Sequence, residues 1–136
     1  MGVIVLDAGV VIALLERRDG HHQAAQSAVA AARHQGDRFV LPASTYSEIL
    51  VNPSRQGPAA VAHVDGIVDA LPSAVVPIDR LIAASAARLR SLHGRALRLP
   101  DALVLATADV LGAERVMTTD NDLEGRGVDV ELIRGQ

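Results

Sequence analysis

The chain has 136 residues, 49% of them hydrophobic and 21% charged, so it is long enough for one domain with a core and too apolar to be intrinsically disordered. It contains no cysteine, which excludes disulfides and thiolate metal sites. A net charge of -3, with one Phe and one Tyr, argues against nucleic-acid binding through bulk charge or base stacking, and no apolar stretch is long enough to cross a membrane. We therefore expect a globular, cytoplasmic protein that forms one domain over residues 1–136.

The first strand of the chain is predicted to be buried on both faces. Residues 3–6 are four consecutive apolar residues, mostly β-branched, which is typical of a central strand in a parallel sheet. Asp7 follows directly. An acid at the carboxyl end of such a strand lies at the edge where open α/β sheets bind ligands, and it must be hydrated, paired or bound to a cation there. Asp7 is therefore the first candidate site residue.

Short apolar strands alternate with helices along the rest of the chain. Pro53 is predicted to break the third helix, Pro72 to end the fourth and Gly112 to close the sixth. The strands are predicted at residues 3–6, 39–41, 75–78, 115–118 and 128–133, and the helices at 8–16, 21–33, 44–51, 59–71, 80–93 and 102–111. This alternation predicts an α/β fold, with a parallel sheet covered by helices on both faces.

Four carboxylates are predicted to reach one edge of this sheet. Asp7 and Asp120 each follow a strand, and Glu48 and Asp101 stand in the first turns of helices that follow loops at that edge. Because strands end and helices begin on the same side of a doubly wound sheet, these acids can converge although they are far apart in sequence. Asp122 is close enough to Asp120 to serve as an additional ligand.

A cluster of carboxylates points to chemistry with a hard cation. Like charges in one cleft repel each other unless a cation joins them, and oxygen ligands without His or Cys favour Mg²⁺ or Mn²⁺ over zinc. Such a site supports metal-assisted attack of water on a phosphodiester. Local structural roles stay open for three acids: Asp101 as an N-cap or first-turn acid that stabilises the helix dipole, Glu48 in a capping box with Thr45, and Asp120 as a turn residue.

Other polar residues have simpler explanations. Asp65 and Asp69 have the spacing of one solvated helix face, and Asp109 lies too far along its helix from Asp101 to share an ion. The pair at residues 21–22, two histidines at a helix start without a partner histidine, is best explained as a solvated turn.

Four segments carry a family resemblance. They read VIVLDA at residues 3–8, SEI at 47–49, LPDALVLATA at 99–108 and VMTTDNDL at 116–123. With these segments in this order, across essentially the whole chain, the sequence resembles the PIN-domain family and, within it, the VapC toxins of bacterial toxin–antitoxin pairs. The third and fourth segments are the most specific, and the second would be weak alone.

The resemblance implies a PIN-like three-layer fold, in which a five-stranded parallel sheet carries helices on both faces. It also implies an endoribonuclease that depends on Mg²⁺ or Mn²⁺, a cognate VapB-like antitoxin that inhibits it, and a homodimer. The acids of the family's site carry over to Asp7, Glu48, Asp101 and Asp120, with Asp122 as a fifth.

Gly9 departs from the family pattern and also bears on the alternatives. The family often has Ser or Thr at this position, so a hydroxyl that could hold a ligand or a phosphate is missing. A phosphatase of the haloacid-dehalogenase type would need a second aspartate at position 9, and a response-regulator receiver would need a late lysine, of which the chain has none. A metal-dependent phosphatase and, from another class, a non-catalytic binding module with the same fold remain the alternatives.

The substrate and the antitoxin each need a binding surface. Arg98, three residues before Asp101, is the nearest candidate to hold a substrate phosphate, followed by Arg95, whereas Arg88 and Arg90 read better as a solvated helix face. An apolar groove between the first four helices could bind an amphipathic antitoxin segment, with burial in the core as the other explanation for the same residues. These residues are Val10, Ile12, Leu14, Val61, Val64 and Ile67.

Overall fold

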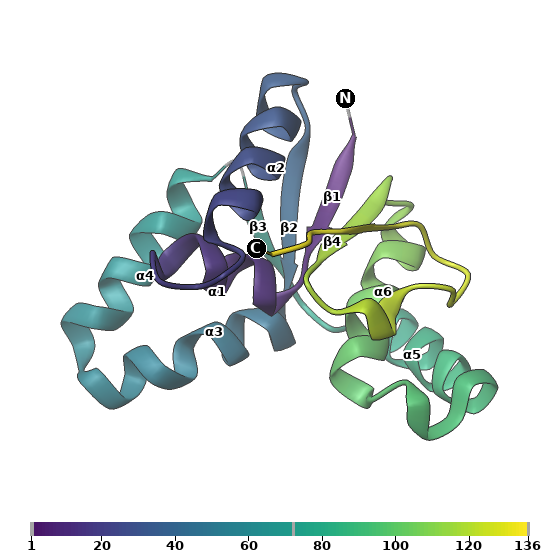
Figure 1. Cartoon of the computed structure of the whole chain (residues 1–136). Coiled ribbons are helices and arrows are strands. Elements are labelled where there is room, and N and C mark those ends of the chain that lie inside the picture. Colours follow the sequence, from purple (N-terminus) through teal and green to yellow (C-terminus); the bar gives the residue numbers. More distant parts are fainter. Residues whose placement is uncertain (1, 72, 136) are drawn as a thin grey trace.

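A sheet of five parallel strands forms the centre of the molecule (Figure 1). The computed structural model describes residues 2–71 and 73–135. The strands are β1 Val3–Leu6, β2 Arg38–Pro42, β3 Ser73–Val76, β4 Arg115–Thr118 and β5 Val130–Leu132, and their order in the sheet is β3-β2-β1-β4-β5. The predicted α/β fold with a five-stranded parallel sheet is confirmed.

Strand β1 is central, as its apolar sequence predicts. Val5 pairs with Val40 of β2 on one side and with Val116 of β4 on the other. From β1 the chain first adds β2 and β3 on one side and then crosses to β4 and β5 on the other. The strand order therefore reverses between β1 and β4, and the crevice beyond the carboxyl ends of strands at such a reversal is where open α/β sheets bind ligands.

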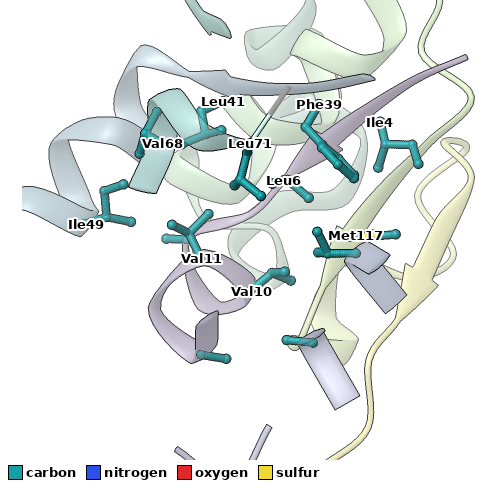
Figure 2. Packing of buried hydrophobic residues seen from close by; sticks show 14 of the residues in the cluster. Ile4, Leu6, Val10, Val11, Phe39, Leu41, Ile49, Val68, Leu71 and Met117 are labelled. Atoms are coloured by element: carbon teal, nitrogen blue, oxygen red, sulfur yellow. The ribbon is translucent and has the colours of Figure 1, made fainter. Parts of the chain in front are cut away.

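Helices cover both faces of the sheet and form two cores. The helices are α1 Ala8–Leu15, α2 His22–His34, α3 Ala43–Gln56, α4 Pro58–Ala70, α5 Arg80–His93 and α6 Leu99–Leu111. Ile4 and Leu6 pack with α1 to α4, and Val5, on the opposite face of the strand, packs with α5 and α6. Figure 2 shows the first of these cores, in which Phe39 and Met117 fill the space over the sheet. Among the helices of the described residues, none is long and apolar enough to span a membrane.

Helix α3 continues through the proline at which the sequence predicted a break. It runs to Gln56 with Pro53 inside it, so the predicted end at residue 51 was wrong. Proline removes one helical N–H and disfavours the preceding turn, but it acts here only near the helix end, where α3 packs against α4. Tertiary packing therefore overrides the local preference. The break comes at Gly57 instead, whose φ of 123° favours glycine.

Three strands differ in their ends from the predicted ranges. β2 runs over Arg38–Pro42 rather than 39–41, so Pro42 lies in the strand. β3 runs over 73–76 rather than 75–78, because Pro77 has no N–H for the ladder and because Ser73 and Ala74 pair with Phe39 and Val40. β5 covers only the middle of the predicted range 128–133. The predicted helix end at residue 72 lies outside the described residues.

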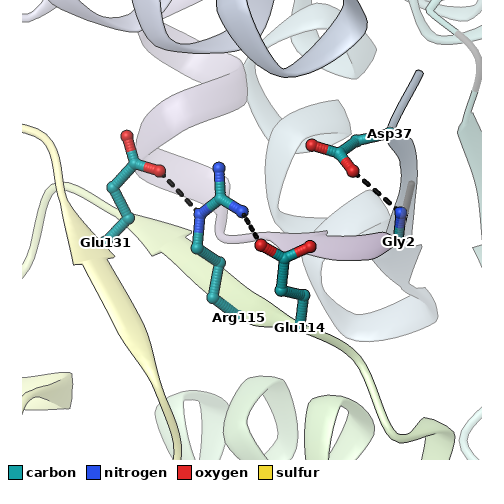
Figure 3. A network of polar contacts seen from close by, with 5 residues as sticks. All are labelled: Gly2, Asp37, Glu114, Arg115 and Glu131. Carbon is teal, nitrogen blue, oxygen red and sulfur yellow. Dashed lines mark hydrogen bonds and ion pairs between the residues drawn. The ribbon is translucent and has the colours of Figure 1, made fainter. Parts of the chain in front are cut away.

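Polar contacts tie the amino ends of the strands together (Figure 3). The Gly2 N–H, just before β1, donates to Asp37 Oδ1, just before β2, at 2.8 Å. At the start of β4, Arg115 Nε donates to Glu131 of β5 at 2.7 Å, and its Nη1 donates to Glu114 at 2.9 Å. These contacts link four strands at the edge of the sheet opposite the crevice between β1 and β4.

Candidate active site

The crevice between β1 and β4 begins with Asp7, which is only 9% exposed. Asp7 is the N-cap of α1: its Oδ1 accepts a hydrogen bond from the Ala8 N–H at 2.8 Å, and its Oδ2 accepts one from Thr118 Oγ1 at 2.6 Å. Burial raises the pKa of Asp7, the hydrogen bonds from Thr118 and Ala8 oppose that rise, and the nearby Asp120 carboxylate adds to it. Each carboxylate oxygen retains a lone pair for a further partner.

Thr118, the last residue of β4, joins two of the acids. It is fully buried, and its hydroxyl donates to Asp7 and accepts a hydrogen bond from the Asp120 N–H at 3.0 Å. Asp120 Oδ1 in turn accepts from the Asp122 N–H at 2.9 Å. One hydroxyl therefore fixes the end of β1 against the loop after β4. The sequence analysis assigned Thr118 only to the strand. The sequence feature that could have identified it is a hydroxyl residue at the end of a strand, two positions before an acid.

Asp101 enters the crevice from the first turn of α6. Its pKa is raised to about 6, first by burial and then by the charges of Asp7 and Asp120, with a smaller rise from Glu48. Arg98, at the N-cap position of α6, opposes this rise. The cap position belongs to Arg98, so the explanation of Asp101 as an N-cap residue is wrong, although its first-turn place still suits the helix dipole.

Glu48 stands on α3 and is exposed, yet it belongs to the same electrostatic cluster. Its pKa is raised by the partial burial of its carboxylate and by Asp7, and it is lowered by Arg98. Because α3 begins at Ala43, Thr45 is already inside the helix, and the capping box proposed for Thr45 and Glu48 does not form. The explanation for this misassignment is that the helix starts one residue after Pro42, earlier than the sequence predicted.

The structure thus brings four predicted acids within electrostatic reach of one another, whereas Asp122 stands apart. Asp122 is exposed on the short 3₁₀ turn η2 (Asn121–Leu123), and its N–H, not its carboxylate, makes the contact to Asp120. That contact is also the turn geometry expected for Asp120, so Asp120 has both a turn role and a place in the cluster. The four acids of the cluster, here called the acid cluster, are Asp7, Glu48, Asp101 and Asp120.

The arginines near the candidate site differ in their contacts, and Arg90, which the sequence assigned to a solvated helix face, is half-buried. Arg98 is exposed and acts on both Glu48 and Asp101, so it lies beside the acid cluster. Arg88 instead faces Asp109 at 3.5 Å, and Arg90 Nε donates to the carbonyl of Leu97 at 2.9 Å. The last two are engaged by structural partners.

A side chain at Gly9 would require the Thr119 side chain to move. An added Cβ would lie 2.3 Å from Thr119 Oγ1, closer than real Cβ contacts allow. The hydroxyl of Thr119 therefore lies next to Gly9, the position at which the family often has Ser or Thr. Sequence reasoning missed Thr119, because only the fold brings it over the first turn of α1.

The carboxylate oxygens of the acid cluster are the type of ligand that a hard cation prefers. All four acids offer oxygen ligands, and the pKa values of three of them are raised, first by burial and then by neighbouring carboxylates, whose repulsion a cation would relieve. Within residues 2–71 and 73–135, no three His, Cys, Asp or Glu side chains already converge as one ligand cage. Mg²⁺ does not require such a cage, since it retains several waters and is held by one or two carboxylates.

The protein is therefore an α/β protein with an acidic site at the carboxyl ends of its parallel strands, where the strand order reverses. Within that class, the PIN-domain model matches residues 4–127, and the chain belongs to the PIN-domain family. No curated protein sequence matches the chain closely enough to count as a relative.

Several solved structures share the fold. A chain from a toxin–antitoxin complex of Klebsiella pneumoniae has 21% sequence identity and a TM-score of 0.80, over 98% of this chain and 99% of that chain. The sarcin-ricin loop cleaving toxin VapC20 of Mycobacterium tuberculosis has 19% identity and a TM-score of 0.75, over 92% and 95%. FitAcB from Neisseria gonorrhoeae has 20% identity and a TM-score of 0.73, over 93% and 95%. These likenesses show that the fold is shared over nearly the whole chain.

Proposed function

We propose that residues 1–136 form one PIN domain that acts in the cytoplasm as a metal-dependent endoribonuclease, the toxin of a VapBC-like toxin–antitoxin pair. The observation that carries this proposal is the acid cluster at the switch point of the sheet, in which burial and neighbouring carboxylates raise the pKa values of Asp7, Glu48 and Asp101, and Asp120 is one of the charges that act on Asp7 and Asp101. The full-length likeness to toxin chains, one of them named as cleaving the sarcin-ricin loop, favours RNA as the substrate class.

Within this proposal the acids hold Mg²⁺ or Mn²⁺. Asp7 and Asp101 are the main ligands, Glu48 and Asp120 complete the site directly or through water, and Asp122 is a further candidate from η2. The bound metal would supply an activated water and neutralise charge on the phosphoryl oxygens. The chain's own contribution is positioning: Thr118 holds Asp7 and the Asp120 backbone in fixed places. Arg98 supplies the cation that draws a substrate phosphate toward this otherwise negative crevice.

A separate apolar groove suits a VapB-like antitoxin. It has a volume of about 510 Å³ and lies between α1, α3 and α4, with Ile12, Leu15, Ile49 and Val64 among its lining residues. Of the six residues predicted for such a groove, Ile12 and Val64 line it, whereas Val10 is fully buried in the core. Ile12 is 41% exposed, which is the condition expected of a residue that packs against a partner helix.

The homodimer is proposed on a different face. Leu81 and Leu92 of α5 are 68% and 71% exposed, and they are eleven residues apart, about three helical turns, so they share one side of the helix. Leu99, at the start of α6, is 49% exposed as well. Exposed leucines aligned in this way favour packing against a second copy, which light scattering of the purified protein tests directly.

Induced expression followed by sequencing of cellular RNA ends tests the function. We expect new RNA ends with the wild type and none with Asp7→Asn, together with cleavage of the same sites by purified protein in Mg²⁺ or Mn²⁺. Full activity in excess EDTA would overturn the metal dependence. Release of phosphate from small phosphomonoesters without RNA cleavage would favour the phosphatase alternative, and a folded protein with neither activity would favour a binding module.

A further inference from the structure

A polar groove adjoins the acid cluster on the side of the C-terminal segment. It has a volume of about 450 Å³, and it is lined by His21 from the turn before α2, by Thr119 and Asp120 after β4, and by Arg134 after β5. Asp120 belongs both to this groove and to the acid cluster, so the two are continuous. We call it the His21–Arg134 groove.

Two side chains in this groove lack a partner within the protein. Arg134 is exposed and makes no ion pair or hydrogen bond with any residue in 2–71 or 73–135. The Thr119 hydroxyl, held over Gly9, has no hydrogen bond in that part of the chain either. The arginines that face structural partners behave differently, as Arg90 and Arg115 show. A guanidinium and a hydroxyl are therefore free for a ligand beside the acid cluster.

His21 is oriented by its neighbours on both sides. Its Nδ1 lies 3.3 Å from Asp19 Oδ1, which also accepts the His21 backbone N–H at 2.8 Å. An ionised carboxylate only accepts hydrogen bonds, so Nδ1 carries the hydrogen and Nε2 is the ring nitrogen left for a ligand. Nε2 lies beside Gly135, another lining residue, where an added Cβ would come within 3.1 Å of it. The His21 Nε2 atom therefore lies at the wall of the groove.

We propose that the His21–Arg134 groove binds one ribose-phosphate unit of single-stranded RNA next to the scissile phosphate, an inference that rests on the proposed endoribonuclease function. Arg134 pairs with the phosphate, and His21 Nε2 forms a hydrogen bond with the ribose 2′-OH. The Thr119 hydroxyl binds a phosphate oxygen. The 2′-OH is the group by which a protein distinguishes RNA from DNA, so His21 contributes selectivity and Arg134 contributes affinity.

The groups that line the groove match a ribose-phosphate unit. Its phosphate offers acceptor oxygens to Arg134 and Thr119, and its 2′-OH, which can both donate and accept, offers a hydrogen-bond partner to His21. Its backbone also continues past Asp120 toward the acid cluster, where a scissile phosphate would lie.

Binding of a random-sequence RNA pool, with a DNA pool of the same length for comparison, tests the proposal. It is measured by fluorescence anisotropy in Ca²⁺, which suppresses cleavage, at several salt concentrations. Arg134→Ala is expected to weaken binding of both pools about tenfold and to reduce the slope of log affinity against log salt by about one phosphate contact. His21→Ala is expected to lower RNA affinity about five- to tenfold, with little change for DNA, because one polar contact is lost only with RNA.

Arg33→Ala and His34→Ala are the matched controls. Both residues are exposed at the far end of α2, about 20 Å along the helix axis from His21, so their variants are expected to bind both pools like the wild type. If wild-type protein neither binds nor cleaves RNA in the presence of metal, the proposed function itself is wrong. If it does, but Arg134→Ala and His21→Ala match the controls, the groove proposal alone is overturned. If these variants bind RNA normally and lose inhibition by the antitoxin instead, the groove binds protein and the proposal is again wrong.

Discussion

The hydroxyl of Thr118 lies 2.6 Å from Asp7 Oδ2, and this hydrogen bond joins two residues 111 positions apart in the sequence. It connects the end of β1 to the end of β4 inside the protein, where both groups are buried. The bond stabilises an ionised Asp7 against the cost of its burial, so Thr118 controls both the charge and the position of the central acid.

Thr118→Val tests this contact, because valine retains the shape of the side chain and loses the hydroxyl. We expect a loss of about 1–3 kcal/mol in the free energy of unfolding at neutral pH, since Asp7 and the Asp120 N–H each lose a buried partner. RNA cleavage should fall as well. Urea unfolding and a cleavage assay measure the two effects, and Thr118→Ser, which retains the hydroxyl, is the control. A Val variant as stable and active as the Ser variant would contradict this role.

Gly9 and Thr119 should behave as a coupled pair. Gly9→Ser is expected to reduce stability by about 1–3 kcal/mol, because its Cβ would overlap Thr119 Oγ1. Adding Thr119→Ala removes the overlapping hydroxyl and should restore most of the loss. Urea unfolding of both single variants and the double variant gives the coupling energy. Additive effects of the two substitutions would show that the residues do not compete for one space.

The raised pKa of Asp101 predicts a pH dependence of stability without metal. Its pKa of about 6 lies above the ordinary value of 3.8, so between these values the folded state binds more protons than the unfolded state. Stability contributed by the protonated group is therefore fully present below about pH 4 and is lost as the pH rises to about 6. Urea unfolding in EDTA across this range measures the loss.

Asp101→Asn should flatten that dependence. At pH 7 without metal it is expected to stabilise the protein by an amount on the order of 1 kcal/mol, because a half-exposed carboxylate is screened by solvent and the full linkage value is not realised. The same substitution should abolish RNA cleavage. Asp109→Asn, on the same helix and outside the acid cluster, is the matched control. An unchanged pH profile in Asp101→Asn would assign the effect to another group.

Arg98 offers a test of substrate binding at the other side of the acid cluster. Arg98→Ala should weaken RNA binding about tenfold and reduce its salt dependence by about one charge, while metal affinity stays nearly unchanged. Binding is measured in Ca²⁺ at several salt concentrations. Arg88→Ala removes an arginine that faces Asp109 instead and is expected to leave the salt slope as it is. An equal slope in the Arg98 variant and the wild type would remove Arg98 from the site.

The apolar groove predicts a variant that escapes inhibition. Ile12→Glu places a charge in the groove at a position already 41% exposed, so folding and RNA cleavage should persist. Binding of the antitoxin encoded next to the toxin should fall more than tenfold, because a charge would be buried without a partner. Calorimetry of the purified proteins measures the affinity. Val51→Glu, at a position 48% exposed on α3 and not among the groove residues, should bind like the wild type. Retained affinity in Ile12→Glu would move the antitoxin to another surface.

The sequence predicted those parts of the fold that depend on local pattern. The run of apolar residues at 3–6 identified the central strand, and Gly112 correctly ended α6 in the left-handed conformation. The acids of the cluster could be found because parallel strands and the helices after them deliver residues to one edge. The register of β3 and the continuation of α3 through Pro53 could not be predicted, because they depend on packing against neighbouring elements, β2 for β3 and α4 for α3.

The site residues that sequence reasoning missed share one property: their partners lie far away along the chain. Thr119 meets Gly9, and Thr118 meets Asp7, only after β4 has paired with β1. His21 was interpreted as part of a solvated turn, and only the position of the C-terminal segment places it on a groove wall. Residue type and spacing carry no information about contacts of this range.

The central place of β1 has a consequence for synthesis of the protein. Asp7 follows the first strand, whereas its partner strand β4 and the loop with Asp120 come much later in the chain and are made long after it. Because domains fold once the elements that complete them have emerged, a nascent chain carries Asp7 for most of translation without the groups that complete the acid cluster. An RNA-cleaving toxin, as proposed above, would thus lack its complete acid cluster until β4 and the loop after it have been made.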